Sequence, residues 1–469
     1  MPANNTSLFE TTIVALATPP GRGAIGVVRL SGPRAWAIAK QLFTPANPQA
    51  TLSARQALFG TLHAPNHPVQ LIDEVLVLPF KSPQSFTGED VVEFQCHGSP
   101  TVLNAVVQAC VNCGATPALP GEFTQRSFLH GRLDLTQAES VLDLIDAKGE
   151  RMMAAATANL HHKTLQTALA SVCEGLIHLQ AQITASVDFP DEVDEPQRGG
   201  LISQAHALSQ QVTALVASSQ HSHWVRNGLT VVLMGRPNAG KSSLFNALLT
   251  QDRAIVTPLA GTTRDTLQET LMVEGIPITL VDTAGLRDEN TDVIEQLGIA
   301  RTWEAVARAQ AVWMLVSSAE NLTIDDTAAW QRLEEKFPHV ARQGLWTQVD
   351  REATKPSPLG WIATSAKTGQ GLPELMEWLK AFVAKQVGQT AHGNAQQQQW
   401  VLTQRQQTCL AQCQEALIRL EDAFSQPSLP LDFATVPLTD ALRSLDSLLG
   451  RDTTDDMLSS VFSQFCVGK

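Results

Sequence analysis

The stretch 231–242, VVLMGRPNAGKS, decides the fold of this chain. Its apolar beginning predicts a buried strand, and SLFNALL directly after it predicts a helix. Between them lies G-x-x-x-x-G-K-S, a loop whose glycines let backbone N–H groups surround a pyrophosphate at a helix N-terminus. We expect the Lys241 ammonium to reach the β- and γ-phosphates and the Ser242 hydroxyl to bind Mg²⁺. The expected phosphate contacts are Asn238, Ala239, Gly240, Lys241, Ser242 and Ser243.

Length and composition limit the number of domains and the kinds of partner that the protein can have. A chain of 469 residues has room for about three domains. Its net charge of −13 argues against a broad basic surface, so any contact with nucleic acid must be local or supplied by a partner. Seven cysteines, an odd number, favour reduced thiols over a disulfide framework. Because the sequence has neither a signal-peptide pattern nor an apolar run of about 18 residues, we expect a soluble cytoplasmic protein without membrane contact.

Residues 1–118 predict an α+β domain. Alternating patterns such as GAIGVVRLSG and DVVEFQCHG are typical of strands, and TVLNAVVQAC is typical of a helix. Cys110 and Cys113 form a C-x-x-C pair, but no second pair at zinc-site spacing accompanies it. We interpret them as two partly buried thiols at a helix end.

Residues 119–226 predict a helical region. Between Arg132 and Pro190 there is no proline, and apolar residues recur at helical spacing, which predicts one long helix or two in line. The acidic DEVDE run that follows is interpreted as a solvated connection rather than a metal site. A second apolar-periodic segment, 201–219, leads to the phosphate-loop strand.

Residues 227–384 alternate strand and helix patterns, which predicts a mostly parallel sheet with helices on both faces, a Ras-like α/β domain. The expected strands are 229–234, 276–281, 311–316, 344–347 and 360–364, and the expected helices are 241–250, 293–309, 324–336 and 371–384. Residues 385–469 contain three amphipathic segments after a polar, glutamine-rich lead-in. The simplest arrangement lets these segments complete a bundle with 119–226, so that the nucleotide domain is an insertion in a helical domain.

Three further motifs inside the nucleotide domain favour a GTPase over an ATPase. Asp282 ends a strand, which turns its carboxylate towards Mg²⁺, and the backbone N–H of Gly285 faces a γ-phosphate. In the loop 261–265, GTTRD, Thr263 is expected to close on Mg²⁺ only when the γ-phosphate is present. A loop after the last strand could read guanine O6 through a backbone N–H. The expected nucleotide contacts in these motifs are Thr262, Thr263, Asp282, Thr283, Ala284, Gly285, Ser365, Ala366 and Lys367.

The guanine-recognition motif departs from the usual N-K-x-D, because residues 347–350 read T-Q-V-D. Asp350 can still accept hydrogen bonds from guanine N1–H and N2–H₂, so selectivity for guanine is expected to persist. We expect Thr347 to be too short to tie the neighbouring loops together, and the uncharged Gln348 to cover only part of the ring. Nucleotide binding is therefore expected to be roughly ten- to a hundredfold weaker than in an otherwise identical N-K-x-D protein.

Several motifs occur together from one end of the chain to the other. They are TPPGRGAIGVVRLSG at 18–32, SFTGEDVVEFQCHG at 85–98, PGEFTQRSFLHGRLDLTQAESVLDLIDA at 120–147, GRPNAGKSSL, AGTTRD and DTAGLR in the nucleotide domain, and FCVGK at the end. In this combination the chain resembles the MnmE (TrmE) family of tRNA-modifying GTPases. The resemblance covers every region, whereas an ordinary Ras-like protein would share only the central motifs.

The resemblance implies a domain plan and a reaction. Residues 1–118 would be a folate-binding-like dimerisation domain, 227–384 the GTPase domain, and 119–226 with 385–469 the helical domain. The family forms homodimers and holds a 5-formyl- or 5,10-methylene-tetrahydrofolate as one-carbon donor. With an MnmG (GidA)-like flavoprotein that contains FAD, it forms a heterotetramer and adds an aminomethyl or carboxymethylaminomethyl group to carbon 5 of the wobble uridine of certain tRNAs. The implied folate contacts are Arg29, Glu93, Arg132 and Lys469.

The resemblance also implies how GTP is hydrolysed. Leu286 stands where Ras-like proteins carry the glutamine that orients water, so another group must supply this function. The family uses a potassium ion in the place of an arginine finger, and a glutamate that orients the water, here Glu295. The implied potassium ligands are Asn238, Thr257, Leu259 and Thr262. For Cys466 we expect a packing or positioning role rather than that of a nucleophile.

Two other classes of function stay open from the residues. A ribosome-assembly GTPase would share the central domain without needing the N-terminal and C-terminal motifs. A folate-dependent one-carbon enzyme with a vestigial nucleotide domain would bind folate without turning over GTP.

Overall fold

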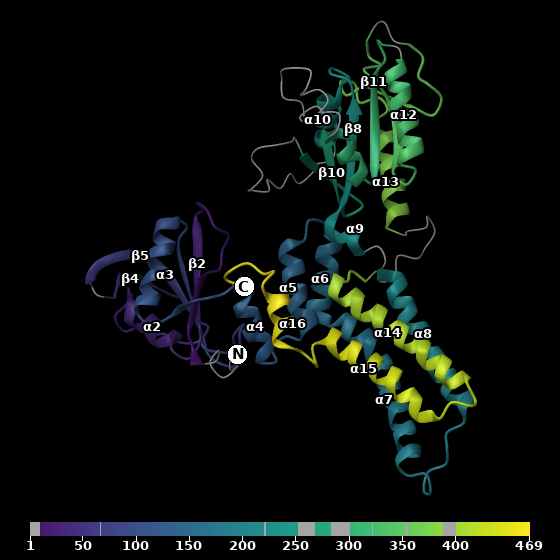
Figure 1. The fold of residues 1–469 in the computed structure, drawn as a ribbon. Coiled ribbons are helices and arrows are strands. Elements are labelled where there is room, and N and C mark those ends of the chain that lie inside the picture. The colour runs from purple at the N-terminus through teal and green to yellow at the C-terminus, as the bar shows by residue number, and fades with distance from the viewer. Residues whose placement is uncertain are drawn as a thin grey trace. The chain divides into compact units, whose positions relative to one another are not determined.

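The computed structural model describes residues 10–65, 67–219, 222–251, 268–282, 301–320, 322–351, 355–387 and 400–469. By their contacts the residues divide into two compact units (Figure 1). Unit 1 comprises Met1–Leu142, Ala158–Val212 and Thr408–Lys469, and unit 2 comprises Asp143–Thr157 and Thr213–Gln407. Each unit is described by itself.

Unit 1 begins with a seven-stranded sheet in the order β3-β4-β5-β6-β2-β1-β7, antiparallel except for the pair β1 and β7. Its strands are β1 (Ile13–Leu16), β2 (Ile25–Ser31), β3 (Phe43–Pro45), β4 (Leu58–Ala64), β5 (His67–Phe80), β6 (Val91–His97) and β7 (Thr116–Pro117). Helices α2 (Ala35–Leu42) and α3 (Pro100–Asn112) share one core with the sheet, which includes Val28 and Leu30 of β2. Because side chains alternate along a strand, Arg29 between them lies on the opposite face.

Cys110 and Cys113 lie in this core and are more buried than the sequence suggested. Burial raises the pKa of both thiols. They pack among apolar side chains of α3 and the sheet, and the Arg34 guanidinium lies near Cys113.

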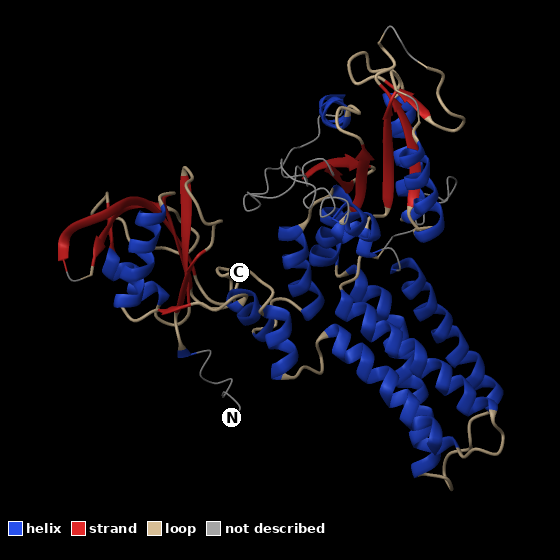
Figure 2. Ribbon diagram, turned by 45° about the horizontal axis from the view of Figure 1, so that its top comes forward, coloured by secondary structure: helices blue, strands red, loops and turns tan. Residues whose placement is uncertain are grey.

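The helices of unit 1, which are among those drawn in blue in Figure 2, include segments from the first half and from the end of the chain, as the colours of Figure 1 show. The helices that contribute residues to it are α4 (Glu122–Leu129), α5 (Leu135–Asp146), α6 (Glu150–His162), α7 (Thr164–Asp188), α8 (Arg198–Ser219), α14 (Gln404–Ser425), α15 (Thr435–Leu449) and α16 (Asp455–Phe462). α15 packs along α7, and Leu458 and Phe462 of α16 are buried against Leu135 and Ala138 of α5. The C-terminal helices therefore complete a helical bundle with the segment that precedes the nucleotide domain, as expected.

The expectation of one long helix or two in line between 132 and 190 is wrong. The structure has three helices there, α5, α6 and α7, and the breaks fall at Gly149 and Lys163. Gly149 leaves room for a carbonyl oxygen, since a Cβ at this position would lie 2.5 Å from the oxygen of Gly275. Lys163 has a left-handed φ of 50° and forms the N-cap of α7.

Unit 2 contains a six-stranded sheet in the order β13-β12-β11-β8-β10-β9, parallel except for β9. The strands are β8 (Leu229–Gly235), β9 (Gln268–Val273), β10 (Ile276–Asp282), β11 (Ala311–Ser317), β12 (Ala341–Thr347) and β13 (Ile362–Thr364). The helices are α9 (Ser222–Asn227), α10 (Lys241–Gln251), α12 (Ile324–Lys336), α13 (Leu372–Gln386) and residues 301–308. The expected strands and helices are confirmed wherever they fall on described residues, and β9 is an addition.

Alternation along β8 divides the core of unit 2 into two layers. Val231 and Leu233 pack with residues of α10 and α13, whereas Val232 packs with Val306 and with Leu333 of α12. A strand that is buried on both faces explains the unbroken apolar run before the phosphate loop. Unit 2 also contains every tryptophan of the chain except Trp36.

Among the described residues, the helices are too short or too polar to cross a membrane.

Candidate functional site

The phosphate loop joins β8 to α10. Gly235 lies so close to β11 that a Cβ there would be 2.5 Å from the carbonyl oxygen of Leu315, so this position requires glycine. Asn238 is exposed and has a left-handed φ of 64°. The Lys241 side chain is buried, and its Nζ donates to the carbonyl oxygens of Gly235 at 2.7 Å and Arg236 at 2.8 Å. The ammonium is thus held over the loop, where a polyphosphate would meet it.

Two oxygen ligands suited to Mg²⁺ stand at the same edge of the sheet. The Ser242 side chain is exposed at the start of α10, and Asp282 is buried at the carboxyl end of β10. The register pairs Asp282 with Leu233 of β8, two residues before the phosphate loop begins. A hydroxyl and a carboxylate fit the hard-oxygen preference of Mg²⁺.

Arg236, inside the phosphate loop, ties this loop to α12. Its Nη2 donates to Asp326 Oδ2 at 2.6 Å and to the Thr323 hydroxyl. Thr323 and Asp326 form the capping box of α12, so one guanidinium binds both members of that box. The contact holds the loop's first turn against a neighbouring helix.

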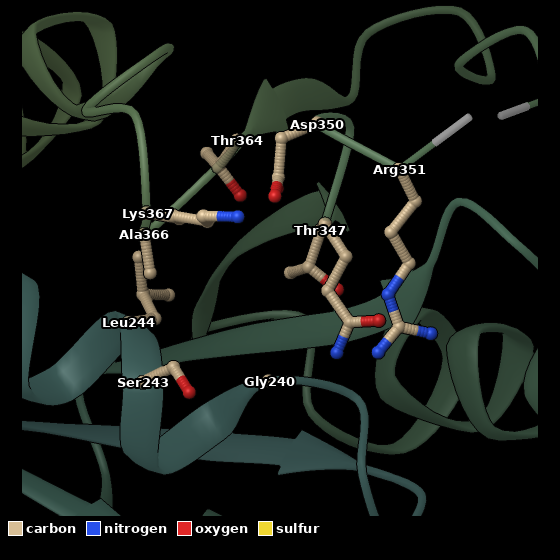
Figure 3. A pocket seen from close by; sticks show the side chains of 10 residues that line it. Gly240, Ser243, Leu244, Thr347, Asp350, Arg351, Thr364, Ala366 and Lys367 are labelled. Atoms are coloured by element: carbon tan, nitrogen blue, oxygen red, sulfur yellow. The ribbon is translucent and has the colours of Figure 1, made fainter.

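A pocket opens beside the phosphate loop, and Figure 3 shows its side chains. It is lined by Gly240, Ser243, Leu244, Thr347, Gln348, Asp350, Arg351, Thr364, Ala366 and Lys367. The pocket thus brings together residues expected from three separate motifs: phosphate contacts of the phosphate loop, and base-side residues of T-Q-V-D and of the loop after β13. Ser365 Oγ donates to Asp350 Oδ1 at 2.7 Å, and this bond is the largest cause that lowers the pKa of the Asp350 carboxyl. Asp350 is therefore kept as the carboxylate that guanine N1–H and N2–H₂ require.

The expectation that T-Q-V-D leaves the loops untied is wrong. Thr347 Oγ1 donates to the carbonyl oxygen of Ala239 at 2.6 Å, so the hydroxyl does span the gap to the phosphate loop. Gln348 Nε2 donates to the carbonyl oxygen of Asn238 at 2.8 Å, and its Oε1 accepts from Ser317 Oγ at 3.0 Å. The backbone of Gln348 is left-handed, with φ of 61°, and this conformation turns its side chain towards the phosphate loop. The T-Q-V-D segment is therefore still linked to the phosphate loop, although the atoms that form the link differ from those of N-K-x-D.

Eight of the expected site residues, and Leu286 in the place of the usual glutamine, lie outside the described residues. The residues concerned are Thr257, Leu259, Thr262, Thr263, Thr283, Ala284, Gly285, Leu286 and Glu295.

A second cluster of charged side chains lies on the face of the N-terminal sheet opposite α2 and α3. Arg29 of β2 and Glu93 of β6 are directly paired in register and form an ion pair at 2.8 Å. The guanidinium lies over the rings of Phe86 at 5.5 Å and Phe123 at 5.7 Å. An ion pair set between two aromatic rings provides both charge and flat apolar surface.

The last residues of the chain reach this cluster. The backbone N–H of Phe123 donates to the carbonyl oxygen of Lys469 at 3.1 Å, and Pro120 forms a β-bridge with Val467. Burial, and then repulsion by Arg29, lowers the pKa of the Lys469 ammonium. Arg29, Glu93 and Lys469 are therefore brought together, as their motif positions predicted.

Two expectations for neighbouring residues are changed. The side chain of Cys466 is exposed, so the thiol does not pack; its backbone positions the tail instead, because its carbonyl accepts from Gly121 N–H. Arg132 is exposed after α4, where its stem lies near Gly88 and its backbone N–H donates to Ser127. The described contacts do not bring Arg132 to the Arg29 cluster.

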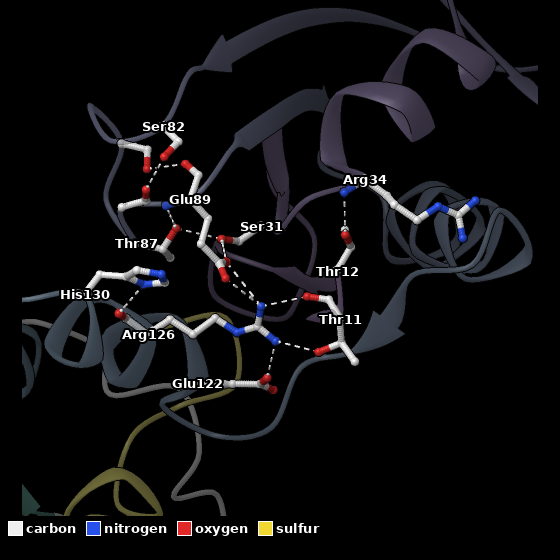
Figure 4. Close-up of polar contacts among 12 residues, drawn as sticks. Thr11, Thr12, Ser31, Arg34, Ser82, Thr87, Glu89, Glu122, Arg126 and His130 are labelled. Atoms are coloured by element: carbon white, nitrogen blue, oxygen red, sulfur yellow. Dashed lines mark hydrogen bonds and ion pairs between the residues drawn. The ribbon is translucent and has the colours of Figure 1, made fainter. Parts of the chain in front are cut away.

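Residues on either side of Phe123 in the sequence belong to a buried ionic network that sequence reasoning missed (Figure 4). Arg126 of α4 is fully buried and donates to Glu89 at 3.1 Å and to Glu122 at 2.8 Å. It also donates to the carbonyl oxygen of Thr11, and Glu89 accepts from Ser31 Oγ at 2.6 Å. Glu122 and Arg126 stand four apart in GEFTQR, a spacing that signals a helical pair; Glu89 had no such signal.

Comparisons with known proteins cover both sites. Residues 12–132 match the family model "GTP-binding protein TrmE N-terminus", and residues 135–466 match the "MnmE helical domain". The tRNA modification GTPase MnmE of Acaryochloris marina is 39% identical over 468 residues, which is 98% of this chain and 100% of the relative. The chain belongs to the MnmE family. The MnmE of Thermotoga maritima is 36% identical over 98% of this chain and 100% of its own length.

Among solved structures, the G domain of the T. maritima FeoB iron transporter is 28% identical and covers 33% of this chain and 98% of its own, with a TM-score of 0.25. The fold of the nucleotide domain of this MnmE family member therefore rests on its own sheet topology.

Proposed function

We propose that this chain hydrolyses GTP in the modification of carbon 5 of the wobble uridine of certain tRNAs, adding an aminomethyl or carboxymethylaminomethyl group. In this proposal GTP hydrolysis is activated by potassium, tetrahydrofolate supplies the one-carbon unit, and a flavoprotein of the MnmG type is the partner. The protein works as a homodimer that joins the flavoprotein in a heterotetramer in the cytoplasm.

The observation that carries the proposal is the pocket beside the phosphate loop. There the hydrogen bond from Ser365 stabilises the ionised form of Asp350. The phosphate loop, whose Lys241 ammonium would bind phosphates, lies beside the same pocket. A carboxylate at this point accepts two hydrogen bonds from guanine and would repel the acceptor N1 of adenine. Ser242 and Asp282 would hold Mg²⁺, which would neutralise charge on the β- and γ-phosphates.

The direct test is mass spectrometry of wobble uridines from cells that lack this protein. We expect the modified uridine to disappear and to return when the intact chain is supplied, but not when Lys241→Ala is supplied. Tightly matched controls are Lys355→Ala and wild type, expressed to the same level. Wobble uridines that stay unchanged in the deletion would overturn the proposal.

Support for the folate donor comes from the Arg29 cluster. Arg29 and Lys469 repel each other, and an anion between them would relieve that repulsion. The rings of Phe86 and Phe123 offer flat surface for a pterin. The chemistry of this set, cations for a glutamate tail beside aromatic rings, fits tetrahydrofolate.

Calorimetry with 5-formyl-tetrahydrofolate tests this part. Arg29→Ala should weaken binding by about 1.5–3 kcal/mol, because a charge-assisted hydrogen bond is lost. Lys40→Ala, an exposed lysine on α2, should leave binding unchanged. Heat of binding that is absent from the intact wild-type dimer would refute the folate proposal.

Potassium activation is supported by Leu286, which offers no group to orient water, and by the exposed side chain of Asn238 in the phosphate loop. In the proposal Asn238, Thr257, Leu259 and Thr262 hold the ion, and Glu295 orients the water. GTP turnover should then be much faster in K⁺ than in Na⁺, and Asn238→Ala should lose most of that difference. Asn227→Ala, at the end of α9, is the matched control. Equal turnover in the two salts would count against this mechanism.

A further inference from the structure

The base pocket is lined by a cation that lies just outside the four-residue motif N-K-x-D. Arg351 directly follows T-Q-V-D and lines the pocket together with Gly240 and Gln348. Its side chain is exposed, and its backbone N–H donates to the carbonyl oxygen of Gln348 at 3.2 Å. Within the part of the chain that the structure describes, its guanidinium forms neither an ion pair nor a hydrogen bond. The group is therefore available to a ligand.

Gln348, which stands where lysine is usual, is already engaged at both ends of its amide. Its Nε2 donates to Asn238 of the phosphate loop, and its Oε1 accepts from Ser317. The amide is neutral and points at the loop. Gln348 thus keeps the loop tie but supplies no charge to a bound base.

Two cations line the pocket on different sides. In Figure 3, Lys367 points into the pocket from the loop after β13, Asp350 lies at the far end, and the Arg351 side chain runs down the other side towards the level of Gly240. After the hydrogen bond from Ser365, the charges of Lys367 and Arg351 both help to lower the pKa of the Asp350 carboxyl. A flat base whose edge is bonded to Asp350 would extend between the two side chains.

A guanidinium suits this position. It is planar and more weakly hydrated than an ammonium, and it stacks on aromatic faces, where cation and π-electron cloud attract each other. It also carries the positive charge that Gln348 lacks.

We propose that Arg351 takes over the part of the missing lysine and covers the face of the guanine base opposite Lys367. Recognition is thereby divided: Thr347 and Gln348 tie the loops, Asp350 reads the edge of the base, and Arg351 covers its face. This inference rests on the proposed binding of guanine nucleotides.

The test is equilibrium titration of the full-length protein with a fluorescent GDP analogue. Arg351→Ala should weaken binding roughly three- to thirtyfold, the range of a partly desolvated cation–π contact, and Arg351→Lys should weaken it less. Arg342→Ala is the matched control, because Arg342 lies at the other end of β12 and pairs with Glu334. It should bind GDP as wild type does.

A second variant separates this role from a general effect on the pocket. If Arg351 replaces the lysine, then installing that lysine as Gln348→Lys makes Arg351 dispensable, and Arg351→Ala should then cost less than about twofold. Removing Arg351 should also weaken GDP and IDP equally, since the face of the base is common to both. Asp350→Asn should instead change the ratio between GDP and IDP, because only GDP carries the 2-amino group.

Two results would overturn the inference while the proposed function stands: unchanged GDP affinity in Arg351→Ala, or an equal loss with and without Gln348→Lys. A wild-type chain that fails to bind GDP would overturn both the inference and the GTPase proposal. Circular dichroism melts of each variant establish that the fold is intact; Arg351 is exposed, so no loss of stability is expected.

Discussion

At the scale of single residues, the most demanding environment is that of Arg126. A fully buried guanidinium between two buried carboxylates is stable only while every partner is present, because each group would otherwise be left charged in a low dielectric. Its neighbour Phe123 contacts both Arg29 and the backbone of Lys469, so the network also supports the proposed folate site.

Removal of this guanidinium should therefore destabilise the folded protein strongly. Arg126→Met is expected to lower the free energy of unfolding by about 3–5 kcal/mol, measured by urea unfolding followed by circular dichroism. The triple variant that adds Glu89→Gln and Glu122→Gln should lose less, because its carboxylates are no longer left unpaired. Arg22→Ala, an exposed loop arginine, is the control and should stay within about 0.5 kcal/mol of wild type. A triple variant less stable than the single one would contradict this account.

Thr347 gives a residue-scale prediction for the base pocket. Thr347→Val keeps the shape of the side chain but leaves the carbonyl oxygen of Ala239 without its 2.6 Å partner in a buried place. We expect nucleotide affinity to fall roughly five- to 150-fold, since an unsatisfied buried acceptor costs about 1–3 kcal/mol. Thr368→Val, in the loop after β13 and outside the pocket lining, serves as the control in the same titration. Unchanged GDP binding in Thr347→Val would show that the tie is dispensable.

The identity of the residues in both sites was readable from the sequence, because G-x-x-x-x-G-K-S and the family motifs fix their types and order. The partners of those residues were not. That Gln348 reaches Asn238 depends on its left-handed backbone, and a glutamine in that conformation has no sequence signature. Glu89 and Arg126 are 37 residues apart and meet only through the fold.

At the scale of elements, α12 shows how the phosphate loop is braced. Its capping box, Thr323 with Asp326, satisfies the first backbone N–H groups of the helix and at the same time binds Arg236. The helix terminus and the loop are therefore stabilised by the same carboxylate.

Asp326→Ala should consequently cost more than the loss of a cap alone. We expect about 1–3 kcal/mol of destabilisation, together with weaker GTP binding, because Arg236 loses its buried partner. Asp325→Ala is a matched control one residue away: Asp325 is exposed, lies in the same first turn and forms no part of the box. Its loss should cost no more than about 1 kcal/mol and leave GTP binding unchanged. Thermal unfolding and nucleotide titration of the two variants test both parts of this prediction, stability and GTP binding.

Elements that carry long apolar periods were predicted within a few residues, and those set by tertiary contact were missed. β9 forms a hairpin with β10 through Glu274 and Gly275, whose φ values of 52° and 75° match a tight turn with left-handed residues. The pair E-G between two apolar runs was a signal that could have found this strand. The break at Lys163, by contrast, replaces a helical residue with a left-handed one that its sequence does not favour.

At the scale of the whole molecule, the thiols are sorted by burial. Six cysteines are buried and Cys466 is exposed. Burial raises the pKa of Cys96 and of Cys413 to about 12, and that of Cys110 in the same direction. These groups are thiols rather than reactive thiolates at neutral pH.

The expected outcome is one fast-reacting thiol in the native protein. Labelling with iodoacetamide at pH 8, read by mass spectrometry of the intact chain, should stop at a single addition, and Cys466→Ser should abolish it. Cys413→Ser should leave the labelling unchanged. In urea all seven thiols should react. Rapid native labelling of a second cysteine would show that the cores open more readily than their packing indicates.

The arrangement of the chain as an inserted nucleotide domain followed from the position of its helical patterns, because segments on both sides of the insertion carried unpartnered apolar faces. The packing of α15 on α7 bears this out. What pattern alone left undecided was where each compact unit ends along the chain, since side-chain contacts set those limits.

The distribution of tryptophan has an optical consequence. Because Trp36 is the sole indole outside unit 2, near-ultraviolet emission of the protein arises mainly from the nucleotide-binding unit, with Trp313 at its centre. Trp36 bonds the carbonyl oxygen of Phe80 through its Nε1 and lies beneath the Lys81 ammonium. Replacing Trp36 with phenylalanine would turn the intrinsic fluorescence into a gauge of unit 2 alone. In a single denaturation experiment, emission would then report unit 2, ellipticity would report the helices of both units, and a difference between the two curves would report unit 1.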